Sequence, residues 1–142
     1  MTPEKFIEKW RAVTVSEIAS AQSHFNDLCE LIDEPKPLAV DPKGERYAFE
    51  KHVIKSDGSP GRADVWKKGC FAWEYKRVGR YKSLARAYGQ LKEYADALEN
   101  PPLLIVCDIS EIQILAPHRI GPSADFAAEH KCDFWKQQGL VD

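Results

Sequence analysis

The chain has 142 residues, of which 44 % are hydrophobic and 30 % charged, and its formal net charge is −2. A chain of this length builds one domain with a core of its own, and an aromatic content of 11 % argues against disorder. The longest aliphatic run, at residues 103–106, is far shorter than the roughly 20 residues that span a bilayer, and no secretory leader pattern opens the sequence. We therefore expect a soluble, cytoplasmic domain without a membrane partner.

Positive charge is concentrated in one segment. Residues 62–86 contain eight basic and two acidic side chains, a net charge of +6, whereas the rest of the chain contains 12 basic and 20 acidic ones, a net charge of −8. A phosphate-binding surface has this arrangement, and a solvated strand and helix surface is the alternative. The negative remainder argues against a free-standing, tight DNA binder, because tight binding requires many phosphate contacts. The candidate DNA-binding residues are Arg62, Lys67, Lys68, Arg77, Arg80, Lys82 and Arg86.

Apolar periodicity predicts an α/β fold. The expected helices span residues 3–12, from about 15 to the prolines at 35 and 37, 83–98 and 123–138, and the expected strands span 46–55, 62–67, 71–76, 103–107 and 111–115. Three strands joined by short turns predict an antiparallel meander, and the helix that follows predicts a crossover to a strand that pairs in parallel. We therefore expect a mixed β-sheet flanked by helices.

Three residues are best placed to carry chemistry: Asp64, Glu74 and Lys76. Glu74 and Lys76 lie two positions apart in an expected strand, so their side chains share a face. Two carboxylates can share a hard divalent cation such as Mg²⁺, which polarises a phosphodiester and activates a water molecule. A lysine beside them can orient or deprotonate that water and offset charge on the phosphate. The alternative is a surface ion pair on a hairpin.

Whether Asp64 joins the other two depends on the turn between the second and third strands. A two-residue turn at residues 68–69 would place Asp64 opposite Trp73, on the wrong face of the sheet. A three-residue loop over 68–70, or a bulge, would place Asp64 opposite Glu74, and Gly69 makes either feasible. We therefore predict a three-residue loop or a bulge at this turn.

Three further side chains are auxiliary candidates. Gln90 and Tyr94 lie four positions apart on one face of the helix expected over residues 83–98, where they could contact phosphates or the metal water. Glu50, in the first expected strand, could supply another carboxylate. Ordinary helix surface and a strand-surface charge are the alternatives.

These motifs together resemble the PD-(D/E)xK nuclease superfamily, whose core is a helix, a three-strand meander, a helix and a strand. The match is Asp64, then nine residues, then Glu74-Tyr75-Lys76, with Gln90-x-x-x-Tyr94 on the following helix. More narrowly, residues 5–116 resemble the N-terminal nuclease domain of MmeI-type (Type IIG/IIL) enzymes, in which a restriction endonuclease and an adenine methyltransferase share one polypeptide. The runs that carry this likeness are Tyr47-Ala48-Phe49-Glu50, Gly61-Arg62-Ala63-Asp64-Val65, Lys67-Lys68-Gly69-Cys70-Phe71 and Pro102-Leu103-Leu104-Ile105-Val106-Cys107-Asp108.

The resemblance implies a restriction-endonuclease-like fold and cleavage of double-stranded DNA with Mg²⁺, or Mn²⁺ in its place. Asp64 and Glu74 would be the metal ligands, and Lys76 would position the water. The superfamily often adds an acidic residue from its first helix, for which Asp27 and Glu30 are both candidates. A catalytically inactive DNA-binding or docking module of the same fold is the alternative reading.

The resemblance also implies a division of the chain. Residues 1–116 would form the nuclease domain, and residues 117–142 a linker and helix leading to further domains. In MmeI-type proteins these are the methyltransferase and target-recognition domains, whose signatures this sequence lacks, so S-adenosylmethionine would bind only there.

Overall fold

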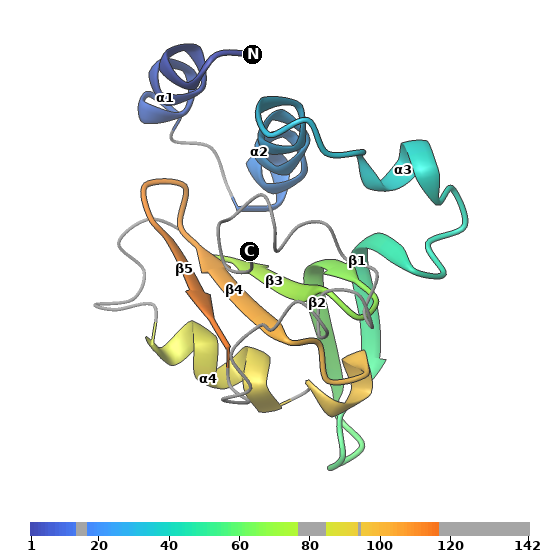
Figure 1. Ribbon diagram of the computed structural model, residues 1–142. Coiled ribbons are helices and arrows are strands. Elements are labelled where there is room, and N and C mark those ends of the chain that lie inside the picture. Colours follow the sequence, from blue (N-terminus) through green and yellow to red (C-terminus); the bar gives the residue numbers. More distant parts are fainter. Residues whose placement is uncertain (14–16, 77–84, 94, 117–142) are drawn as a thin grey trace.

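A computed structural model describes residues 1–13, 17–76, 85–93 and 95–116 (Figure 1). Its elements are α1 (Pro3–Arg11), α2 (Glu17–Leu31), α3 (Pro37–Val40), β1 (Tyr47–Ile54), β2 (Pro60–Lys67), β3 (Phe71–Tyr75), α4 (Ala85–Glu93), the 3₁₀ helix η1 (Asp96–Leu98), β4 (Leu103–Cys107) and β5 (Ile112–Leu115). Within the described ranges, no helix is long and apolar enough to cross a membrane.

The strands form one mixed sheet in the order β1-β2-β3-β4-β5. β1, β2 and β3 pair antiparallel as a meander, β3 and β4 pair in parallel, and β5 pairs antiparallel with β4. The parallel pair follows from the crossover through α4, which returns the chain to the end of the sheet where β3 began. The expected mixed α/β fold is therefore confirmed.

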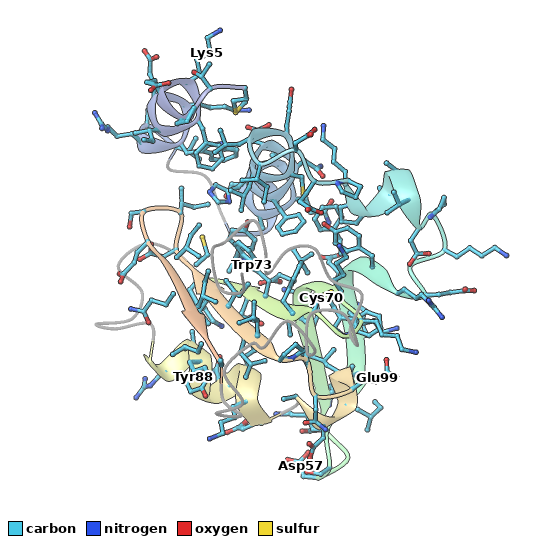
Figure 2. All side chains as sticks on the ribbon, in the orientation of Figure 1. Lys5, Asp57, Cys70, Trp73, Tyr88 and Glu99 are labelled. Carbon is cyan, nitrogen blue, oxygen red and sulfur yellow. The ribbon has the colours of Figure 1, made fainter. Side chains whose placement is uncertain are left out.

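Helices cover both faces of the sheet. α1 and α2 lie on one side and α4 on the other (Figure 1). The α2-side core consists of Ala21, Phe25, Cys29, Tyr47, Val65, Cys70, Phe71, Trp73, Tyr75, Leu103, Ile105 and Cys107. The α4-side core consists of Ala63, Trp66, Ala72, Ala87, Leu91, Ala95, Leu98, Leu104 and Val106. Figure 2 shows Trp73 on the α2 side of the sheet and Tyr88 on α4.

The central strands alternate between these two cores. Phe71, Trp73 and Tyr75 of β3 belong to the α2-side core, whereas Ala72 belongs to the α4-side core. This is the period of two that a strand requires, and every residue of β3 and β4 is buried because both faces are covered. The expected alternation in the third strand is confirmed.

Two helices differ from the sequence-based expectation. The helix expected over 83–98 is divided, with α4 ending at Glu93 and η1 following as a separate, tighter turn. Leu98 of η1 is still buried in the α4-side core, which explains why the apolar spacing continued past the end of α4. The short helix α3 lies between the second expected helix and the first expected strand, where no element was predicted, and Pro37 begins it because its fixed φ suits the first helical position. The helix expected over 123–138 lies outside the described residues.

Candidate functional site

The β2–β3 turn brings two carboxylates together. The ladder pairs Val65 with Trp73 and Lys67 with Phe71, so residues 68–70 form a three-residue loop. Gly69 has a φ of +72°, a left-handed conformation that glycine adopts without strain. The ladder ends at Val65 and Trp73, so Asp64 and Glu74 are the next residues on the two strands. The predicted three-residue loop is therefore confirmed.

A polar cavity of about 110 Å³ lies beside this pair, where α2 meets the first three strands. It is lined by Ala21 and Gln22 of α2, Glu50 of β1, Arg62 and Asp64 of β2, Glu74 and Tyr75 of β3, and Lys76 directly after β3. Asp64, Glu74 and Lys76 thus border one cavity, although they come from two strands and the residue that follows.

Both carboxylate oxygens of Asp64 accept hydrogen bonds. The backbone N–H of Tyr75 donates to Oδ2 at 2.7 Å, and the Arg62 guanidinium donates from Nη2 to Oδ1 at 3.1 Å. The Asp64 side chain is only 13 % exposed. Its position is therefore fixed by one backbone donor and one charged side chain.

Lys76 connects Glu74 to α4. Its Nζ lies 3.3 Å from Oε1 of Glu74 and donates to Oε1 of Gln90 at 3.0 Å. The side chains of Lys76 and Glu74 are both close to nine-tenths buried, so this ion pair is well shielded from solvent. Gln90, an auxiliary candidate, contacts the lysine and so holds its ammonium group in place.

β2 changes faces at Asp64. Val65 packs in the α2-side core, whereas Ala63, two positions before it, packs in the α4-side core. Residues two apart in a regular strand share a face, so the alternation of β2 is broken between them.

β1 changes faces at the same level. Phe49 packs against the α2-side core, whereas Nζ of Lys51 lies 4.7 Å from the ring centroid of Trp66 in the α4-side core. Glu50, between them, has a φ of +51°, which is rare for a residue other than glycine. The side chains of β1 change from one face of the sheet to the other at Glu50, and those of β2 do so at Asp64 on the neighbouring strand. Both residues line the cavity. Sequence alternation gave no sign of this break.

A buried histidine supports the site from the α2 side. His24 is fully buried, and its Nδ1 shares a hydrogen bond of 2.7 Å with Oη of Tyr75. The rings of Phe6 and Trp10 pack on the imidazole at centroid distances of 5.2 and 5.0 Å. Burial lowers the pKa of His24 to about 4, although the Asp27 charge acts in the opposite direction. Burial also raises the pKa of Tyr75 well above its usual value.

The acidic candidates of α2 lie away from the cavity. Asp27 accepts hydrogen bonds from Lys9 at 2.6 Å and from the Trp10 indole at 3.1 Å, so it ties α2 to α1. Glu30 is exposed and lies 4.0 Å from Lys36. Of the described α2 residues, the cavity is lined by Ala21 and Gln22, and Gln22 was not among the candidates.

The basic candidates are dispersed. Arg62 lines the cavity, whereas Lys67 and Lys68 lie at the β2–β3 turn, 3.9 Å from Glu34 and 3.4 Å from Glu99. Arg86 is exposed on α4. DNA binding by these side chains stays a prediction. Arg77, Arg80, Lys82 and the auxiliary candidate Tyr94 lie outside the described residues.

The donor set of the cavity suits a hydrated magnesium ion. Mg²⁺ is bound in proteins through one or two carboxylates and substrate phosphates while it keeps several waters. Asp64 and Glu74 supply two carboxylates, and the cavity has room for water molecules. In the part of the chain that the structure describes, no group of three or more His, Cys, Asp or Glu side chains is arranged as a metal site.

A family model described as the N-terminal domain of MmeI matches residues 1–139. The chain belongs to this family. Membership confirms the resemblance to the N-terminal domain of MmeI-type enzymes and gives the domain a restriction–modification context. No curated protein and no solved structure matches the chain.

Proposed function

We propose that this MmeI N-terminal domain is the Mg²⁺-dependent DNA endonuclease part of a restriction–modification enzyme. The observation that carries the proposal is the placement of Asp64, Glu74 and Lys76 around one polar cavity. Family membership supports a DNA substrate, since restriction–modification enzymes act on DNA.

Asp64 and Glu74 would hold the metal ion. When bound, Mg²⁺ supplies Lewis-acid polarisation of the scissile phosphate and lowers the pKa of its water. The backbone N–H of Tyr75 keeps the Asp64 carboxylate oriented toward the cavity. Because this donor belongs to the backbone, no donor side chain has to be ordered to hold the carboxylate.

Lys76 would act on the phosphate and on the attacking water. Its ammonium group, held between Glu74 and Gln90, can donate a hydrogen bond to a water in the cavity and offset the charge that develops on the phosphate. Gln90 would be a positioning residue for this lysine.

Sequence recognition and methylation would belong to other domains of the same polypeptide. The net charge of −8 outside residues 62–86 supports this division, because an acidic body gains little from non-specific DNA contact. The proposal keeps the division of the chain given above. Residues 1–116 would be the nuclease unit, and residues 117–142 would be a linker and helix. S-adenosylmethionine would bind in the further domains.

A catalytically inactive docking module of the same fold is the second candidate. One observation favours it: Arg62 lies between Asp64 and Glu50 and offsets part of their negative charge without a metal ion.

Plasmid cleavage separates the two candidates. Asp64→Asn in the full restriction–modification polypeptide should abolish Mg²⁺-dependent cleavage, while an amide oxygen can still accept the Tyr75 bond and preserve the fold. Asp57→Asn is the matched control, because Asp57 lies in the β1–β2 turn away from the cavity (Figure 2). Cleavage that survives Asp64→Asn would reject the nuclease assignment.

A further inference from the structure

We propose that Arg62 is an internal counterion of the metal site that makes metal binding depend on DNA. This inference rests on the proposed nuclease function and adds a mode of regulation to it. In the free domain the guanidinium would occupy the place next to Asp64 that a cation needs, and a DNA phosphate would draw it away.

Arg62 bridges two carboxylates at the cavity. Its Nη2 lies 3.1 Å from Oδ1 of Asp64 and its Nη1 lies 3.6 Å from Oε1 of Glu50. A guanidinium keeps its positive charge at every physiological pH. One of the two negative charges is therefore already offset by a side chain before any metal arrives.

The two oxygens of Asp64 differ in how firmly they are held. The donor at Oδ2 is a backbone N–H of Tyr75, at the end of the buried strand β3, and it cannot withdraw without distorting the sheet. The donor at Oδ1 is the end of a long side chain that can change rotamer. A cation approaching Asp64 therefore competes with Arg62 at Oδ1.

The exposure of the three side chains indicates which one can move. Asp64 is 13 % exposed, whereas Arg62 is 37 % and Glu50 is 44 % exposed. Arg62 is therefore more accessible than the carboxylate of Asp64, and a DNA phosphate could reach it first. Its planar donors match a phosphate in a two-point contact, and such contacts are stronger than those of neutral donors.

A divalent cation and a guanidinium repel one another when both lie against the same carboxylate. A phosphate relieves this repulsion, because it pairs with Arg62 and leaves Oδ1 to the metal. The two binding events must then favour each other by the same factor. Glu50 would be a positioning residue for Arg62, and its left-handed φ is part of the strand turnover that directs it toward the cavity.

Metal affinity without DNA gives the first test. The full polypeptide is titrated with Mn²⁺ as wild type, Arg62→Gln and Asp64→Asn, and electron paramagnetic resonance measures the concentration of free Mn²⁺. Removing the competing charge should tighten Mn²⁺ binding about tenfold in Arg62→Gln, the scale expected for one charge a few ångströms away in a partly solvated site. Arg62→Lys keeps the charge and should bind Mn²⁺ like the wild type. Lys36→Gln, which removes a positive charge beside Glu30, is the control and should change nothing.

The coupling to DNA gives the second test. Fluorescence anisotropy measures the affinity for duplex DNA with and without Ca²⁺, a hard cation that is bound by oxygen ligands. Ca²⁺ should strengthen DNA binding severalfold more in the wild type than in Arg62→Gln. Mn²⁺ affinity in Arg62→Gln equal to or weaker than in the wild type, or an unchanged Ca²⁺ effect, would overturn the role of Arg62.

The same titrations separate the two proposals. Mn²⁺ binding that is identical in wild type and Asp64→Asn, with and without DNA, would reject the metal site itself and therefore the proposed function. Mn²⁺ binding that is lost in Asp64→Asn but has the same affinity in Arg62→Gln as in the wild type would reject only the proposed role of Arg62 as a counterion.

Discussion

The backbone N–H of Tyr75 donates a 2.7 Å hydrogen bond to Oδ2 of Asp64. The ring of the same tyrosine is anchored in the core by the bond between its hydroxyl and His24. One residue thus joins the packing of α2 on the sheet to the carboxylate that we propose as a metal ligand. Changes in the core beneath the site should therefore reach the site through Tyr75.

Protonation of His24 should destabilise the fold in acid. The pKa of this histidine is about 4 in the folded chain and about 6.5 unfolded, so below pH 6.5 the unfolded state binds more protons. Its contribution to stability is complete above pH 6.5 and is lost as the pH falls to 4, by about 3 kcal/mol in total. Urea unfolding at a series of pH values measures this slope. His24→Phe removes the titrating group and should flatten that part of the profile; an unchanged slope would show that other groups cause it.

Lys76→Gln should reduce the rate of DNA cleavage by about 10²–10³, the usual loss when one charge-stabilising donor is removed from a site. Mn²⁺ affinity should not fall, because the lysine is a cation and not a ligand. Single-turnover plasmid cleavage and Mn²⁺ titration together check this. Lys92→Gln, an exposed position of α4, is the control. A loss of metal binding equal to the loss of rate would assign Lys76 a purely structural role.

Asp27→Asn should leave metal binding and cleavage unchanged. Its carboxylate holds Lys9 and the Trp10 indole and does not line the cavity, so the cost should fall on the contact between α1 and α2, at about 1 kcal/mol of unfolding free energy. Thermal unfolding and Mn²⁺ titration measure the two effects. A weaker Mn²⁺ affinity in this variant would show that Asp27 contributes to the metal site after all.

Two glycine substitutions should change the free energy of unfolding in opposite directions. Gly69→Ala forces a side chain into the left-handed region at φ +72° and should cost about 1–2 kcal/mol. Gly89→Ala, inside α4 where an added Cβ meets no atom within 4 Å, should stabilise by roughly 0.4–1 kcal/mol. Denaturant unfolding of both variants checks the pair. Equal effects would contradict the assigned turn geometry.

The strand pattern of this chain could be predicted because it is local. Phe71, Trp73 and Tyr75 alternate with smaller or polar residues, and that period alone assigns the two faces of β3. The three-residue loop followed from one requirement, that Asp64 and Glu74 share a face.

The turnover of β1 and β2 could not be predicted, because Glu50 takes its left-handed φ from the sheet around it and not from its own preference. The neighbours of the polar face of α2 are likewise a tertiary property. Ala21, Phe25 and Cys29, spaced by four, face the core, and this turns Asp27 toward α1 and leaves Gln22 at the cavity.

The most direct test of the central claim is anomalous diffraction at the manganese edge, from crystals of the polypeptide grown with duplex DNA and millimolar Mn²⁺. We predict a peak within coordination distance of both Asp64 and Glu74, with the Arg62 guanidinium moved from Oδ1 to a phosphate. Crystals in which duplex DNA is bound at full occupancy but no manganese lies between those two carboxylates would contradict the account.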